Sequence, residues 1–286
     1  MSRTHAPPAL PPDVPPDAEV AARGLAKAFD GRQVLNPLDL TIRQGEIVAI
    51  VGASGSGKTV LMQCLCGLLA ASAGTVWARD HSRPGAPRVA ITHMGERELE
   101  PVRRAWSVVF QQNALFSGSV YENCAIWLRE NLRWDEARID VRVRKVLADT
   151  GLDVKDVLPK GRDALSGGMA KRVAVARALV SDPAVIWYDE PTTGLDPGSA
   201  RVIHDLIWQT HHARTASGVQ RTSVIVTHDR DLLRRLHPRV VMLDGGTVCF
   251  DGPYEAFAHA AGGPAAAYLA EMPALQGRPV APPQPG

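Results

Sequence analysis

The chain has 286 residues, of which 45% are apolar and 22% are charged, a balance that is ordinary for a globular protein with a sizeable core. The net charge is only +2 and basic and acidic residues are interleaved, so nothing indicates a nucleic-acid-binding face. No stretch approaches the roughly 18 consecutive apolar residues of a membrane span, and the N-terminus lacks the apolar core of a signal peptide.

Four cysteines, Cys64, Cys66, Cys124 and Cys249, are too few and too scattered for a disulfide framework. Cys64 and Cys66 are two residues apart in an expected helix, so their side chains point to different faces and do not make a metal pair easily. We expect all four to be small buried thiols in a reducing, cytoplasmic setting.

Both ends of the chain differ from its middle. Residues 1–17 are rich in proline and lack apolar periodicity, so we expect a disordered tail. Residues 259–286 form a C-terminal extension that we expect to be partly disordered, although Tyr268 and Leu269 could dock on another surface. Between these ends, residues 18–258 alternate short apolar runs with longer amphipathic ones, which predicts an α/β domain.

Three apolar runs predict buried strands. Residues 45–52 run into a glycine-rich turn and are followed by an apolar helix over 59–70. Residues 184–190 end in two carboxylates, and residues 222–229 carry a histidine, His228, at the end of the apolar run. Open α/β sheets gather their ligand groups at such strand ends, so we expect the functional site there.

A helical lobe is expected over about residues 112–180, inserted into the α/β core. Its most regular part is a helix over 135–151, with Asp135 as N-cap and Gly151 just past the end. One face of this helix carries the apolar residues Ile139, Val143, Val146 and Leu147.

Residues 52–59, GASGSGKT, fit the P-loop pattern and lie between an expected strand and helix, as that motif requires. The glycines allow backbone N–H groups and the helix N-terminus to face a polyphosphate. Lys58 should reach the β- and γ-phosphates of ATP, and the Thr59 hydroxyl should ligate Mg²⁺. A glycine-rich turn that only connects strand to helix is the weaker alternative. The nucleotide-binding residues expected here are Gly52, Ser54, Gly55, Gly57, Lys58 and Thr59.

Asp189 and Glu190 follow the strand expected over 184–188. Adjacent side chains at a strand end diverge, so one carboxylate can hold Mg²⁺ through water while the other polarises the attacking water. Alone, such a pair is more often an ordinary loop feature. With a P-loop upstream, we expect Asp189 at the metal and Glu190 as the catalytic base.

Residues 165–169, LSGGM, resemble the LSGGQ signature of ABC ATPases, and the chain resembles ABC transporter ATP-binding subunits over residues 18–258. A Ser-Gly-Gly helix cap alone would fit less well at this place upstream of the two carboxylates. The resemblance implies a P-loop NTPase cassette with a RecA-like core, an antiparallel β subdomain and an inserted helical subdomain. It also implies a homodimer, in which Ser166, Gly167 and Gly168 bind the nucleotide held by a second copy.

The remaining positions of the family match in order. Gln111 corresponds to the Q-loop glutamine, which implies contact with Mg²⁺ and the attacking water; Gln112 is the neighbouring competitor. Asp196 corresponds to the D-loop aspartate, implied to reach across the dimer, and His228 to the histidine that contacts the γ-phosphate. Phe29 lies at the interval from the P-loop where the family places an aromatic that stacks on adenine. Packing of Phe29 in the core is the alternative.

Met169 and the run FQQNALFSGSVYENC over residues 110–124 resemble the ATPases of Mla/Mkl-type lipid transporters. That resemblance implies an MlaE-like permease in a separate polypeptide, an MCE lipid-binding protein, phospholipid cargo and a peripheral place on the cytoplasmic face of the inner membrane. Another importer or exporter class is the first alternative. A soluble ABC ATPase of ribosomes or DNA repair is the second; a single cassette without coiled coils or zinc hooks argues against it.

Overall fold

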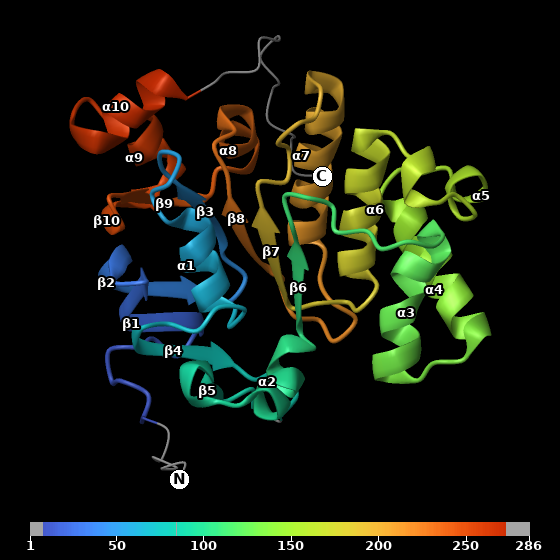
Figure 1. Ribbon diagram of the computed structural model, residues 1–286, viewed down its shortest axis with the longest axis horizontal. Helices are drawn as coiled ribbons and strands as arrows, with labels where there is room; N and C mark the ends of the chain where they lie inside the picture. Colours follow the sequence, from blue (N-terminus) through green and yellow to red (C-terminus); the bar gives the residue numbers. More distant parts are fainter. Residues whose placement is uncertain (1–7, 84, 273–286) are drawn as a thin grey trace.

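The computed structural model describes residues 8–83 and 85–272, which form two sheets with helices packed around them (Figure 1). The larger sheet has six strands in the order β10-β9-β3-β8-β7-β6. All neighbours are parallel except β10, which runs antiparallel to β9 at the edge. Its strands are β3 (Ile47–Val51), β6 (Trp106–Val109), β7 (Val185–Asp189), β8 (Thr222–Val226), β9 (Arg239–Asp244) and β10 (Thr247–Pro253).

The smaller sheet is antiparallel and has the order β2-β1-β4-β5. Its strands are β1 (Ala18–Phe29), β2 (Arg32–Arg43), β4 (Ala73–Arg79) and β5 (Arg88–Ala90). One buried cluster joins both sheets through Leu25 of β1, Ile50 of β3 and Leu61 of the helix α1 (Lys58–Leu65). The expected α/β architecture with an antiparallel β part is therefore confirmed.

Helix α1 ends at Leu65, several residues before the end predicted from the apolar run. Gly67 has a φ of +68° and its N–H donates to the carbonyl of Cys64, which stops the helix in the way a left-handed glycine commonly does. Leu68, expected inside the helix, is exposed. The apolar composition of the run concealed this stop, because Leu68 and Leu69 continue the run beyond the glycine.

Four α-helices and the short 3-10 helix η2 (Arg162–Ala164) lie between β6 and β7 and form a lobe on one side of the larger sheet (Figure 1). In α4, the Asp135 carboxylate accepts the N–H of Arg138 at 2.8 Å, and Gly151 follows with a φ of +70°. Both predicted ends of this helix are therefore confirmed. The helices of the lobe are α3 (Val120–Leu132), α4 (Glu136–Asp149), α5 (Val154–Val157) and α6 (Gly167–Leu179). The predicted apolar face of α4 is buried: Ile139, Val143, Val146 and Leu147.

The remaining helices lie outside this lobe. Residues 85–100, where the sequence has little pattern, contain β5, a short 3-10 helix and the start of α2. None of the described helices is long and apolar enough to cross a bilayer. These further helices are η1 (Ile91–His93), α2 (Glu96–Arg103), α7 (Pro197–His212), α8 (Arg230–Leu236), α9 (Tyr254–Ala258) and α10 (Gly263–Glu271).

Part of the N-terminal tail that we expected to be disordered lies against the smaller sheet. Asp13 forms an ion pair with Arg23 at 2.8 Å, and Val14 is buried. The indole N–H of Trp77 donates to the carbonyl of Pro8 at 3.3 Å. Proline-rich sequence can therefore be held by side chains that lie elsewhere in the chain. Residues 1–7 and 273–286 lie outside the described residues, so the expectation for them stays a prediction.

The cysteines correct one expectation. Cys64, Cys66 and Cys124 are buried, and burial raises their pKa values to about 11, about 12 and about 12. Cys249 is exposed, contrary to the prediction. It lies on β10, an edge strand whose alternate residues face away from the core, and the sequence pattern had not identified this strand.

Candidate active site

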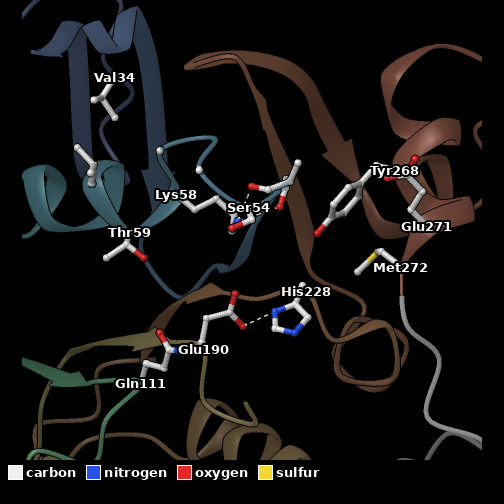
Figure 2. A pocket seen from close by; sticks show the side chains of 15 residues that line it. Val34, Ser54, Lys58, Thr59, Gln111, Glu190, His228, Tyr268, Glu271 and Met272 are labelled. Carbon is white, nitrogen blue, oxygen red and sulfur yellow. Dashed lines mark hydrogen bonds and ion pairs between the residues drawn. The ribbon is translucent and has the colours of Figure 1, made fainter. Parts of the chain in front are cut away.

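A pocket of about 720 Å³ opens beside the ends of β3, β7 and β8 (Figure 2). It brings together residues of the P-loop with Gln111, Glu190 and His228, which come from three separate connections of the larger sheet. The carboxyl ends of parallel strands meet at one edge of a sheet, so residues far apart in sequence converge there. The structure therefore places these predicted site residues around one pocket.

The loop between β3 and α1 depends on glycines that approach other backbone closely. Gly52 has a φ of +144°, and a Cβ there would lie 2.2 Å from the carbonyl oxygen of Leu243. Gly57 has a φ of +98°, and a Cβ there would lie 2.8 Å from Cδ2 of Leu35. Larger residues at either position would push the loop away, so both glycines are needed for this backbone path. The path directs the N-terminus of α1 into the pocket, where backbone N–H groups favour an anion.

Lys58 is the first residue of α1 and reaches back over the loop. Its Nζ donates to the carbonyl oxygens of Gly52 at 2.8 Å and Ala53 at 2.9 Å. Burial lowers the pKa of Lys58, while the nearby carboxylates of Glu190 and Asp189 oppose that shift. An ammonium has three donors, so one remains that can face a phosphate in the pocket. This geometry fits a polyphosphate ligand.

Thr59 and Asp189 meet across the gap between α1 and β7. The Thr59 hydroxyl donates to Oδ1 of Asp189 at 3.0 Å. Asp189 is 6% exposed and burial raises its pKa, although the hydrogen bond from Thr59 opposes the shift. A hydroxyl and a carboxylate oxygen are hard ligands of the kind that Mg²⁺ prefers. The two residues therefore fit a magnesium ion, and Gln111 lines the same pocket.

Glu190 and His228 face each other beside the P-loop, with Oε2 of Glu190 2.8 Å from Nδ1 of His228 (Figure 2). Glu190 has a φ of +47°, an uncommon backbone conformation for a residue with a side chain. Its N–H donates to the carbonyl of Val226 at 2.9 Å, and the Thr193 hydroxyl donates to Oε2 at 3.2 Å. The carboxylate is mostly enclosed while the imidazole is half exposed, so the pair borders the space open to a ligand.

The signature residues lie elsewhere. Ser166 caps α6, and its hydroxyl accepts the N–H of Met169 at 3.3 Å; Gly167 and Gly168 form the first turn. Asp196 caps α7 and accepts the N–H of Ser199 at 3.0 Å. Among the described residues that line the pocket, none of the expected signature residues or Asp196 is present. Their role toward a second copy stays a prediction.

Phe29 is also not among the described residues that line the pocket. It ends β1 and is 42% exposed, with the ammonium of Lys27 4.7 Å from its ring centroid. This exposure argues against the alternative that Phe29 packs in the core. Stacking of Phe29 on adenine remains a prediction.

The C-terminal extension contributes a wall that the sequence did not predict: Tyr268, Glu271 and Met272 line the pocket opposite the P-loop (Figure 2). Burial raises the pKa of the Tyr268 phenol, while the backbone of Gly52 opposes the shift. An aromatic residue in an alanine-rich stretch marks Tyr268 as a docking residue. Only the fold shows that the surface it meets is the P-loop.

Lys171 is a second residue that the sequence did not single out. It lies on α6, is 1% exposed, and its Nζ donates to the carbonyl oxygens of Phe110 at 3.2 Å and Gln111 at 2.8 Å. Burial lowers its pKa to about 8, partly opposed by Asp189. Lys171 therefore ties the signature helix to the backbone of the pocket residue Gln111.

The sequence model of the ABC transporter family matches residues 35–193, which is more than half of the chain. The chain belongs to the ABC transporter family. Its members are ATPases that use ATP with Mg²⁺, and the phosphate cradle and the hydroxyl–carboxylate pair fit both. The observed core, antiparallel sheet and helical lobe correspond to the cassette that the sequence predicted.

Relatives support the same family. The chain is 37% identical over 233 residues to the nickel import ATP-binding protein NikO of Rhodobacter capsulatus, covering 81% of this chain and 87% of the relative. It is 35% identical over 246 residues to the protein TRIGALACTOSYLDIACYLGLYCEROL 3, chloroplastic, of Arabidopsis thaliana, covering 82% and 68%. It is 33% identical over 237 residues to the probable ribonucleotide transport ATP-binding protein mkl of Mycobacterium tuberculosis, covering 82% and 62%.

Solved structures agree with the fold. A dimeric post-hydrolysis state of the ATP-binding cassette MJ0796, bound to ADP and Pi, superposes with a TM-score of 0.71 at 27% identity and covers 82% of this chain and 98% of that one. The cassette cbiO1 of Clostridium perfringens, part of the transporter complex cbiONQ, gives 0.68 at 31% identity and covers 85% and 92%.

Proposed function

We propose that this ABC ATPase drives a separate membrane permease that moves phospholipid or another lipid between membranes. The contact between Glu190 and His228, 2.8 Å long and beside the P-loop, carries the hydrolytic part of the proposal. It supplies a base and a polar partner at the place where a terminal phosphate on the P-loop would lie. Closure and reopening of a dimer would convert hydrolysis into movement of the permease.

In the proposed reaction, Lys58 and the N–H groups of the P-loop bind the phosphates of ATP. Thr59 and Asp189 hold Mg²⁺ together with Gln111, and the ion, when bound, neutralises charge on the phosphates. Glu190 orients the attacking water and accepts its proton. His228 keeps the Glu190 carboxylate in place through their direct contact and faces the γ-phosphate side.

Two copies of the chain are proposed to form the complete sites. Ser166, Gly168 and Asp196 are absent from the described lining of their own chain's pocket, so each chain holds an unused half-site. In a dimer, the face that carries these residues would close the pocket of the partner. The related cassette MJ0796 is dimeric in its structure with ADP and Pi, which supports this arrangement.

The proposal of a lipid cargo rests on the amino-acid sequence. Met169 and residues 110–124 have the form found in Mla/Mkl-type ATPases. One relative carries a galactolipid in its name, whereas others are named for nickel import and ribonucleotide transport. Lipid transport is therefore the first candidate and another transported substrate the second. An MlaE-like permease and an MCE protein at the cytoplasmic face of the inner membrane are the partners that we propose.

A gentle-detergent purification of the tagged chain from its native membrane tests the cargo. Co-purification of an MlaE-like permease, an MCE protein and bound phospholipid is the expected result. Recovery of a permease of another type would support the role of the chain as a transporter ATPase but contradict the proposed lipid cargo. Recovery of ribosomes or DNA-repair factors without a membrane protein would overturn the transport proposal.

A further inference from the structure

Helix α7 carries a buried histidine with no role in the reaction described so far. His204 is 3% exposed, and its Nε2 lies 2.7 Å from Oδ2 of Asp229. Asp229 directly follows His228 in the chain. The contact therefore links α7 to the segment that carries one partner of the proposed catalytic pair.

Asp229 gathers donors from three parts of the chain. Besides His204, its Oδ2 accepts the hydroxyl of Thr192 at 2.8 Å. Its Oδ1 accepts the N–H groups of Asp231 at 2.9 Å and Leu232 at 3.0 Å, which caps α8. Burial raises the pKa of Asp229, but the hydrogen bonds, led by that from His204, outweigh burial and lower it. An ionised Asp229 can only accept, so Nε2 of His204 carries the hydrogen.

The same carboxylate also holds the segment after Glu190, because Thr192 is two residues further along the chain. Glu190 has the uncommon φ of +47°, and such a conformation persists only where the surrounding contacts hold it. Asp229, next to His228 in the chain, thus connects the segment of His228 to the segment that carries Glu190. The hydrogen bond from His204 holds the Asp229 carboxylate in this position.

Helix α7 also borders the half-site presented to a second copy. Asp196 caps its first turn, and Ser199 in that turn lies so close to the signature loop that a Cβ on Gly168 would be 2.7 Å from its Oγ. The helix therefore contacts the signature residues at its start and, through His204, contacts Asp229, the chain neighbour of His228, two turns later. One rigid element spans both half-sites of the chain.

We propose that His204 is a positioning residue, which locks α7 to Asp229 and so holds His228 against Glu190 while the signature half-site is engaged. The proposal rests on the hydrolytic roles proposed above for Glu190 and His228. Loss of the His204 donor leaves the fold and the phosphate cradle in place. It lets the segment around Asp229 relax, so that the imidazole of His228 no longer faces the carboxylate.

His204→Leu, in the full-length chain, removes the donor while keeping an apolar side chain of similar size in the buried site. We expect kcat for ATP hydrolysis to fall roughly 10- to 100-fold, as for a lost hydrogen bond to a charged group, with KM and the Kd for ATP within about twofold. His204→Gln retains an N–H donor and should recover most of the activity. His212→Gln alters an exposed histidine of the same helix and should leave activity unchanged.

A spectroscopic reading separates positioning from general loosening. In ¹⁵N-histidine NMR spectra, the Nδ1 signal of His228 should report its contact with Glu190, and it should shift in His204→Leu but not in His204→Gln. If His204→Leu does not fold by circular dichroism, Thr192→Val removes the other side-chain donor to Asp229 and should produce the same shift and the same loss of kcat.

Glu190→Gln and His228→Ala in the same assay separate the two proposals. If both lose turnover while folded His204→Leu keeps wild-type kcat, the inference about His204 fails and the catalytic roles stand. A fall of kcat in His204→Leu without any change in the His228 signal also overturns it. If Glu190→Gln and His228→Ala hydrolyse ATP at the wild-type rate, the catalytic roles fail and the inference fails with them.

Discussion

A lysine and two neighbouring carboxylates lie close together at the pocket, and the contacts of each carboxylate determine its environment. Lys58 lies near both carboxylates of the strand end, while Thr59 donates to one and His228 contacts the other. The two neighbouring carboxylates therefore differ in environment. In the proposed reaction, Asp189 would be a ligand of the metal and Glu190 would face the attacking water, so the two neighbours would have different roles.

Glu190→Gln should separate binding from chemistry. The amide keeps the size of the side chain but is not a base, so we expect kcat to fall by about 10²- to 10⁴-fold with ATP affinity nearly unchanged. Phosphate release and nucleotide binding measure the two quantities. Glu130→Gln, an exposed change on α3, is the control. Wild-type turnover in Glu190→Gln would remove Glu190 as the base.

At the scale of elements, two helices contact the pocket without belonging to its strand ends. The signature helix α6 reaches the backbone of Gln111 through Lys171, and α10 places Tyr268 opposite the P-loop. Both contacts join segments that lie far apart in the chain. Through these contacts, the helical lobe and helix α10 are each connected to residues that line the pocket.

Lys171 predicts a pH dependence. Its pKa is lowered from 10.5 to about 8, so between these values the unfolded chain binds more protons at this residue than the folded chain. Its contribution to the free energy of unfolding therefore rises with pH across this window, by about 1 to 3 kcal/mol. Denaturant unfolding of the wild type and of Lys171→Met at pH 7 and pH 10 measures it. The free energy of unfolding of the wild type should increase relative to that of the variant as pH rises. An unchanged difference between the two would contradict the prediction.

Tyr268→Ala should weaken ATP binding. The aromatic ring forms part of the pocket wall, and its removal should lower affinity roughly two- to tenfold, the scale of an aromatic contact. Tyr268→Phe keeps the ring and should bind ATP nearly as the wild type does. Titration with a fluorescent ATP analogue measures both. Tighter binding by the alanine variant would show that α10 obstructs the pocket instead of completing it.

As a whole, the molecule presents two half-sites on one chain. The pocket holds the groups proposed to bind and hydrolyse ATP, while the signature residues are not among the described residues that line it. Under the proposed function, this separation means that Ser166 acts on the pocket of a second copy, which makes dimer formation a property of the whole molecule.

Glu190→Gln with MgATP should dimerise, and Ser166→Arg in the same background should prevent it. Ser166 does not line the described pocket of its own chain, so the arginine should leave binding of ATP to the monomer within about twofold while blocking the partner's approach. Light scattering gives the mass, and equilibrium binding gives the affinity. A Ser166→Arg variant that still dimerises with ATP would place the interface elsewhere.

The sequence alone determined those features that depend on neighbours in the chain. The P-loop, the two ends of α4 and its buried face follow from glycine conformation, capping chemistry and helical periodicity, all of which act over a few residues. The order of motifs likewise predicted the family and the core. The early stop of α1 at Gly67 and the exposure of Cys249 were missed, because continuous apolar runs and unrecognised edge strands hide them.

The tertiary structure alone decided which distant groups touch. The contact of Glu190 with His228, the burial of His204 against Asp229 and the place of Tyr268 join segments separated by 25 to more than 200 residues. No local pattern encodes these contacts, since they depend on the order of parallel strands and on how helices pack across them. The physical reason is that local sterics choose the elements, whereas burial of their combined apolar faces chooses their neighbours.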